Sequence, residues 1–173
     1  MKTPICSFDA KTGTLCSKCE DKLRSGQLTQ VDVESAVKLT KISERDQEIN
    51  KFTMVNAYQV NGDTVLVLQR SDISALRSNT ELARKIQAEY ESKIWFVEAE
   101  ATDKRFLENL FFPARILSIN LIWLPDGIKL TKVIVALQDT RESHINIERI
   151  QKITKRVRNL ELLVELEPAR NRK

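Results

Sequence analysis

The chain has 173 residues, with 28 lysines and arginines against 24 aspartates and glutamates, a formal net charge of +4. At 42% hydrophobic and 30% charged residues it has a globular composition; it contains no transmembrane-length apolar run, and its N-terminus lacks a signal-peptide core, so we expect a cytoplasmic protein. A single histidine (His144), four glycines and no Walker, GxGxxG, HExxH or GxSxG motif predict a protein that is not an enzyme.

All three cysteines lie within the first 19 residues, as Cys6, Cys16 and Cys19. Cys16 and Cys19 form a CxxC, the spacing with which two thiolates hold one tetrahedral metal ion. Asp9 follows Cys6 at the same two-residue gap and can supply a carboxylate as the fourth ligand. The sequence therefore predicts a small zinc knuckle with these four ligands; a redox CxxC and a cysteine cluster that has lost its metal are the alternatives.

Hydrophobic periodicity and turn residues predict an α+β protein. In chain order, we expect a helix over 27–49, strands over 55–60 and 64–69, a helical turn over 72–76, a helix over 80–91, a strand over 93–98, a helix from Thr102 to before Pro113, strands over 114–124 and 128–137, a helix over 145–157 and a strand over 160–167. Trp95 falls in an apolar strand and is expected in the core, whereas Trp123 precedes a turn and is expected to be partly exposed.

The order strand, strand, short turn, helix, strand occurs twice. A shift of 68 residues matches Val65 with Val133, and it also matches Phe96 with Val164. Each half has about 50 residues, close to the lower limit for an independent core. We therefore expect two small α+β units packed together.

The tandem pattern resembles the two type II KH domains of archaeal NusA-like proteins. The resemblance is carried by VLVLQR (65–70), ELARKIQAEYESKIWFVE (81–98), DKRFLENLFFPARILSI (103–119) and NIERIQKITKRV (146–157). A subset of that family also carries an N-terminal zinc knuckle. The resemblance implies a knuckle over 1–26, a connecting helix over 27–49, a first KH-like domain over 50–100, a linker helix and second KH-like domain over 101–167, and a basic tail over 168–173.

The GxxG loop with which KH domains grip single-stranded nucleic acid is degenerate in both halves. The first loop falls near residues 77–80, which include Arg77, and the second falls within 140–147; neither contains glycine. A side chain in place of glycine blocks close approach of phosphates to the backbone. The resemblance therefore implies the fold more directly than it implies the usual KH grip on RNA.

The positive charge gathers at the C-terminal end, where residues 141–173 hold nine basic and five acidic residues and the first 140 residues have no net charge. Arg149, Lys152 and Arg156 recur on one face of the expected last helix, with Lys155 and Arg158 beside them. Together with Arg77, these residues are the candidate nucleic-acid contacts, and Arg170, Arg172 and Lys173 add a basic tail. An ordinary solvated helix face is the alternative interpretation.

Three functional hypotheses follow. The resemblance implies an RNA-binding adaptor in transcription elongation or termination, with RNA polymerase and the nascent transcript as partners. A ribosome-associated or small-subunit ribosomal protein that binds rRNA is the first alternative, and a protein-interaction scaffold without RNA is the second. None of these requires a membrane or a small-molecule substrate.

Overall fold

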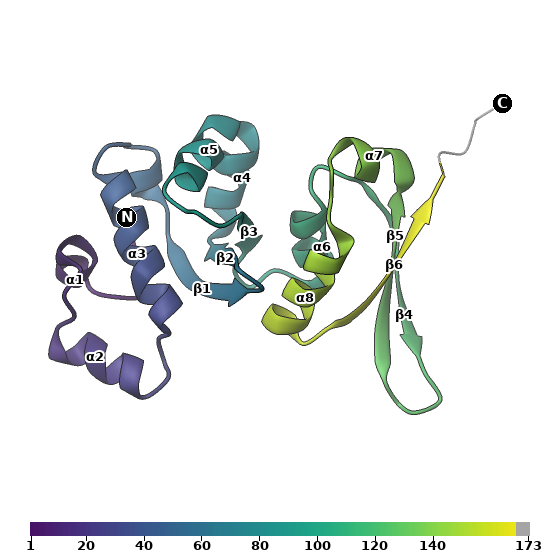
Figure 1. The fold of residues 1–173 in the computed structure, drawn as a ribbon, viewed down its shortest axis with the longest axis horizontal. Coiled ribbons are helices and arrows are strands. Elements are labelled where there is room, and N and C mark those ends of the chain that lie inside the picture. Colours follow the sequence, from purple (N-terminus) through teal and green to yellow (C-terminus); the bar gives the residue numbers. More distant parts are fainter. Residues whose placement is uncertain (169–173) are drawn as a thin grey trace. The chain divides into compact units, whose positions relative to one another are not determined.

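The computed structural model describes residues 1–168 and divides into two compact units, Met1–Glu100 and Ala101–Lys173 (Figure 1). The basic tail residues Arg170, Arg172 and Lys173 lie outside the described residues. No helix within residues 1–168 combines the length and apolar character needed to cross a membrane. We describe each unit by itself.

The first unit contains six helical segments and three strands. In chain order they are α1 (Ser7–Thr12), α2 (Ser17–Arg24), α3 (Gln30–Ser43), the 3-10 helix η1 (Ile49–Lys51), β1 (Met54–Val60), β2 (Asp63–Leu68), α4 (Arg70–Ser78), α5 (Thr80–Ala88) and β3 (Ile94–Glu98). The second unit continues with α6 (Asp103–Phe111), β4 (Ile116–Trp123), β5 (Lys129–Ala136), α7 (Leu137–Glu142), α8 (Ile147–Arg158) and β6 (Glu161–Glu167).

Each unit has one three-stranded sheet, and the two sheets have the same topology. In the orders β1-β2-β3 and β4-β5-β6, the first two strands are antiparallel and the last two parallel. Both sheets shift register near the start of their first strand, at Met54/Asn56 and at Ile116/Ser118. When the two bulges are superimposed, Leu68 of β2 and Val135 of β5, which pair with the residues at the bulges, occupy the same position. Strands β2 and β5 therefore repeat with a 67-residue offset, one less than the sequence comparison predicted.

A helix precedes each sheet and belongs to its unit. Helix α3 packs on β1 and α5, and α6 packs on β4 and α8. Thr29 caps α3 and Thr102 caps α6, each accepting a hydrogen bond from a backbone N–H three residues later. The repeated unit is therefore helix, strand, strand, helix, helix, strand, one helix longer than the repeat read from the sequence.

The capping box of α3 also connects this helix to the first sheet. Asp32 Oδ2 accepts hydrogen bonds from the Thr29 backbone N–H and hydroxyl, both at 2.8 Å. Its other oxygen, Oδ1, accepts a 2.6 Å hydrogen bond from the backbone N–H of Ala57 in β1. The buried carboxylate thus satisfies a strand donor and a helix terminus together.

Most predicted elements are confirmed, and Trp95 is buried, with its indole N–H donating to Asp63 Oδ2 at 3.0 Å. The Asn61-Gly62 hairpin has positive φ at both residues, as its sequence predicts. The sequence analysis missed α7, because six residues are too few to display a helical period. The structure is α+β, with an N-terminal cysteine cluster followed by two tandem KH-like units of type II topology.

Candidate metal centre and nucleic-acid surface

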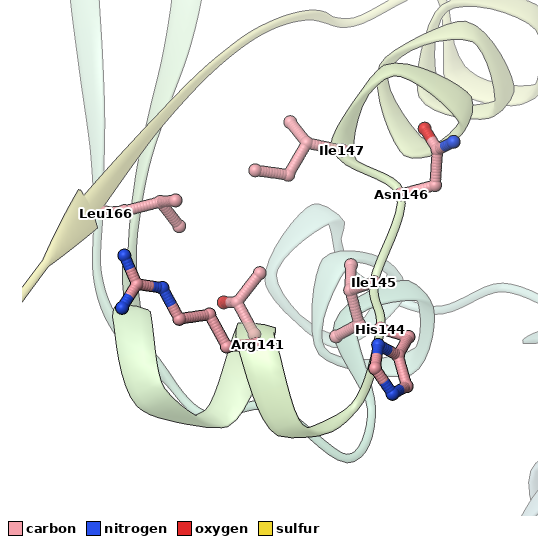
Figure 2. A pocket seen from close by; sticks show the side chains of 7 residues that line it. Arg141, His144, Ile145, Asn146, Ile147 and Leu166 are labelled. Atoms are coloured by element: carbon pink, nitrogen blue, oxygen red, sulfur yellow. The ribbon is translucent and has the colours of Figure 1, made fainter.

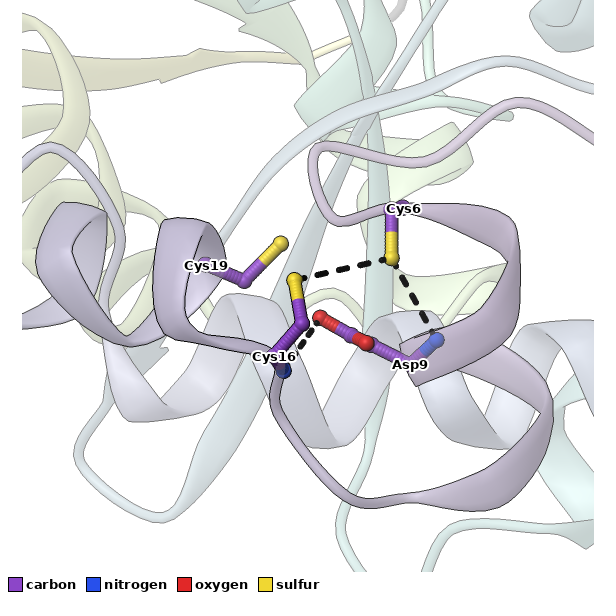
Figure 3. Close-up of side chains that lie close together, drawn as sticks. All are labelled: Cys6, Asp9, Cys16 and Cys19. Atoms are coloured by element: carbon purple, nitrogen blue, oxygen red, sulfur yellow. Dashed lines mark hydrogen bonds between the residues drawn. The ribbon is translucent and has the colours of Figure 1, made fainter.

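Two matching helix starts place the four predicted metal ligands together (Figure 3). Cys6 and Cys16 are the N-cap residues of α1 and α2, each with extended backbone dihedral angles. Asp9 and Cys19 are the third residues of the same helices, so the first turn of each helix brings one of them back toward its cap residue. The C-x-x-D and C-x-x-C spacings therefore produce two facing pairs of ligands.

The ligand atoms have a spacing that suits one ion. All four lie within 4.8 Å of one another, and the Sγ atoms of Cys6 and Cys16 are 4.0 Å apart. A tetrahedral zinc with Zn–S bonds of about 2.3 Å separates two thiolates by about 3.8 Å. A disulfide needs about 2.05 Å between its sulfur atoms, so this pair is far from one.

The Asp9 carboxylate supplies an independent indication of a cation. Its side chain is fully buried, Oδ2 accepts a 3.1 Å hydrogen bond from the Cys16 backbone N–H, and Oδ1 has no hydrogen-bond partner. A buried carboxylate oxygen without a partner is costly unless a cation satisfies it. Asp9 therefore fits the role of a ligand better than that of a simple helix residue.

The pKa values of Asp9 and Cys19 indicate which of the two groups holds a proton when no ion is bound. The neighbouring Cys19 thiol, first among several causes, lowers the pKa of Asp9 to about 2. Burial, followed by the contact with Asp9, raises the pKa of the Cys19 thiol to about 12. Without an ion the site thus holds a carboxylate and a thiol; metal binding replaces the thiol proton.

The cluster is part of the first unit rather than an appendage. Ala10 and Cys19 are almost fully buried and belong to the same apolar cluster as Leu39 of α3 and Leu66 of β2. Helix α1 packs on α3. Cys6, Asp9, Cys16 and Cys19 could bind a metal ion at one wall of this core; the prediction that the ion is zinc stays a prediction.

Helix α8 carries five of the six predicted nucleic-acid contacts. Arg149, Lys152, Lys155 and Arg156 are exposed on it. Lys152 pairs with Glu148 at 2.8 Å, and Lys155 pairs with Glu161 of β6. These are solvent-exposed ion pairs, which contribute about 0–1 kcal/mol and exchange readily for another anion.

Arg158 and Arg77 lie in different surroundings. Arg158 is half-buried, donates to the Ala101 carbonyl at 2.7 Å and stacks on the Phe106 ring at 5.2 Å, so it holds α6 and α8 of the second unit together. Arg77 is exposed near the end of α4 in the first unit. The assignment of both residues to nucleic-acid binding stays a prediction.

The two candidate loops differ in length. In the first unit, Asn79 alone ends α4 and begins α5, where its side chain accepts from the Glu81 N–H at 3.1 Å. In the second unit, residues 143–146 separate α7 from α8, and His144 has a left-handed φ of 48°. The second unit alone therefore has a turn of several residues at this place.

A pocket of about 630 Å³ opens beside this turn (Figure 2). Its lining comes from α7, the turn, the first residue of α8 and β6: Thr140, Arg141, His144, Ile145, Asn146, Ile147 and Leu166. Arg141 extends toward Leu166, and the His144 ring lies at the turn. The sequence analysis did not single out Asn146 or Leu166; asparagine ahead of an apolar helical period was the available signal for the helix cap.

No protein family and no curated protein matches the sequence. Solved structures do match the fold. One of them, titled "Crystal structure of APE1850", aligns over 75% of this chain and 95% of that chain, with a TM-score of 0.49 and 17% sequence identity.

Proposed function

We propose that the protein is a non-enzymatic RNA-binding adaptor of the NusA-like type, with RNA polymerase and the nascent transcript as partners in transcription elongation or termination. The observation that carries the proposal is the row of exposed cations on α8, Arg149, Lys152, Lys155 and Arg156, within a KH-like unit. Cationic side chains on one helix attract a phosphate backbone without reading its sequence. The link from KH-like topology to RNA is an argument by fold analogy.

The contacts on α8 favour phosphate binding over a purely structural role. Lys152 and Lys155 are paired only with exposed glutamates, whose side chains are 74% and 46% accessible. A phosphate can replace such partners at little energetic cost. Arg156 is exposed on the same helix and forms no ion pair within residues 1–168.

We assign the RNA contact to the second unit. The single-residue junction at Asn79 leaves no loop in the first unit along which a phosphate backbone can run. Arg141 of α7 and His144 and Asn146 of the turn line a pocket at the N-terminal end of α8, the helix that carries these cations. Glu142 at the end of α7 opposes phosphate, which favours the α8 side of the turn.

Replacing Arg149 and Lys152 with glutamate is expected to abolish binding of single-stranded RNA at physiological salt. The measurement is fluorescence anisotropy with a labelled oligonucleotide over a salt series, in which each lost phosphate contact lowers the slope of log K against log salt by about one. The matched control replaces exposed Lys41 and Arg84 of the first unit with glutamate, the same change in net charge. If both variants lose RNA affinity equally, the loss comes from the change in net charge and not from specific contacts of the α8 cations.

The partner complex decides between the transcriptional role and the ribosomal alternative. A tagged chain purified from cell extract is expected to retain RNA polymerase subunits. Retention of small ribosomal subunits instead would favour the ribosomal alternative, and undetectable RNA binding at low salt would leave only the scaffold hypothesis.

A further inference from the structure

Strand β4 is an edge strand without a charged residue. It is one of the two longest strands, with the sequence ILSINLIW over eight residues, and it borders the β4-β5-β6 sheet. Within residues 1–168 its outer edge pairs with no other strand. Proteins usually protect such edges with charged residues, proline, short length or a bulge, and of these β4 has only the bulge near its start, at Ile116/Ser118.

Large apolar side chains lie exposed along the same strand. Leu117, Leu121 and Trp123 are 50%, 57% and 69% accessible. Leu121 and Trp123 stand opposite Thr131 and Lys129 in β5, and the Lys129 ammonium lies 6.0 Å from the Trp123 ring. Five of the seven large exposed apolar residues of the chain's described part belong to this sheet or its β4–β5 turn. Leu121 and Trp123, two residues apart on β4, share one face of the sheet, and exposed apolar side chains gathered in this way indicate an interface.

Two other edge strands, β6 and β1, lack this combination. Strand β6, at the opposite edge of the sheet, carries Glu161, Glu165 and Glu167, charged residues of the kind that protect a sheet edge. Strand β1 in the first unit is uncharged, but Gln59 is its only exposed residue. Apolar side chains and an open, neutral edge thus coincide at β4.

We propose that two copies of the protein associate through antiparallel pairing of β4 with β4 about a twofold axis near Asn120. In that arrangement Leu121 of one copy lies beside Ile119 of the other, and the unpaired backbone groups of both edges form hydrogen bonds. The result is one six-stranded sheet in the order β6-β5-β4-β4-β5-β6. Both of its ends are acidic β6 edges, so the assembly closes as a dimer and does not extend into a fibre.

A second copy fits this surface better than nucleic acid or an unrelated protein does. A strand with no charge meets its own copy without repulsion, and twofold symmetry places aliphatic side chains against aliphatic side chains. Lys129 at the start of β5 is the cation over the exposed Trp123 ring, and Asp126 lies in the adjoining β4–β5 turn, so the surface lacks the cationic excess expected for a phosphate backbone.

Analytical ultracentrifugation of the full chain, loaded with zinc and kept under reducing conditions, tests the proposal. The wild-type chain is expected to show a concentration-dependent monomer–dimer equilibrium. Leu121→Lys is expected to raise the dimer dissociation constant by about tenfold or more, because each dimer contains the substituted residue twice, once in each copy. The control Leu163→Lys, which changes an exposed leucine on the acidic edge, is expected to leave it unchanged.

A mixing experiment separates pairing at β4 from a general loss of fold. Leu121→Lys and Leu121→Glu are each expected to be folded monomers by circular dichroism, and an equimolar mixture is expected to regain the dimer in a salt-sensitive way. A wild-type chain that stays monomeric at its highest soluble concentration would overturn the proposal. An equimolar mixture that stays monomeric would also overturn the proposal. If the chain is monomeric and Leu121→Lys lowers its affinity for RNA, the proposal also fails, and the surface is assigned to RNA binding instead.

Discussion

Replacing Cys16 with serine is expected to abolish metal binding and to lower the free energy of unfolding of the Met1–Glu100 unit by about 3 kcal/mol or more. A metal ion that binds only the folded site contributes its binding energy to stability, and this site forms one wall of the core through Cys19 and Ala10. Elemental analysis is expected to find one zinc per wild-type chain and none in the variant. Thermal unfolding monitored by circular dichroism measures the loss of stability.

A conservative change at the fourth ligand is the matched control. Asp9→Cys supplies a thiolate in place of the carboxylate and is expected to retain the metal, whereas Asp9→Asn is expected to bind it more weakly because the amide carries no charge. Metal-free wild-type protein, purified fresh under reducing conditions, would contradict the zinc centre. Unchanged stability of Cys16→Ser would show that the metal, even if bound, does not support the fold.

A second large loss of stability is expected from replacing Asp32, whose buried carboxylate joins α3 to the first sheet. Asp32→Ala is expected to destabilise the protein by about 3 kcal/mol, because it removes the carboxylate of the α3 capping box and leaves the Ala57 N–H buried without its acceptor. Urea unfolding followed by circular dichroism measures the effect.

Two milder variants isolate the parts of this effect. Asp32→Asn keeps an acceptor oxygen and is expected to cost less, while Thr29→Ala removes only the cap hydroxyl and is expected to cost about 1 kcal/mol. If Asp32→Ala costs no more than Thr29→Ala, the hydrogen bond to β1 contributes nothing to stability.

The parts of the fold that sequence reasoning reached are those with a strong local signal. The Thr29–Asp32 capping box starts α3, and Asn61-Gly62 forms the hairpin turn because both residues adopt positive φ readily. Cys6, Asp9, Cys16 and Cys19 come together because ligand spacing is itself a local property. These features depend on residues three or fewer apart, or on two copies of such a motif.

The parts that it missed depend on contacts distant in sequence. Nothing near Asp32 indicates that its second oxygen accepts from Ala57, 25 residues away. Arg158 looks like one more cation on the face of α8, and only the fold places it over Phe106. The short helix α7 is held by the sheet it follows, through contacts with β5, and not by any periodicity of its own.

The number of residues between the two paired helices is fixed in the first unit, where Asn79 alone joins α4 to α5, but it is free to change in the second unit. One residue added or removed there would turn α5 by about 100° about its axis and carry Leu82 and Ile86 away from the core that they fill. The four residues between α7 and α8 can absorb the same change in their own backbone. Natural variants of this protein should therefore differ in length at the second turn and keep a fixed length at the first.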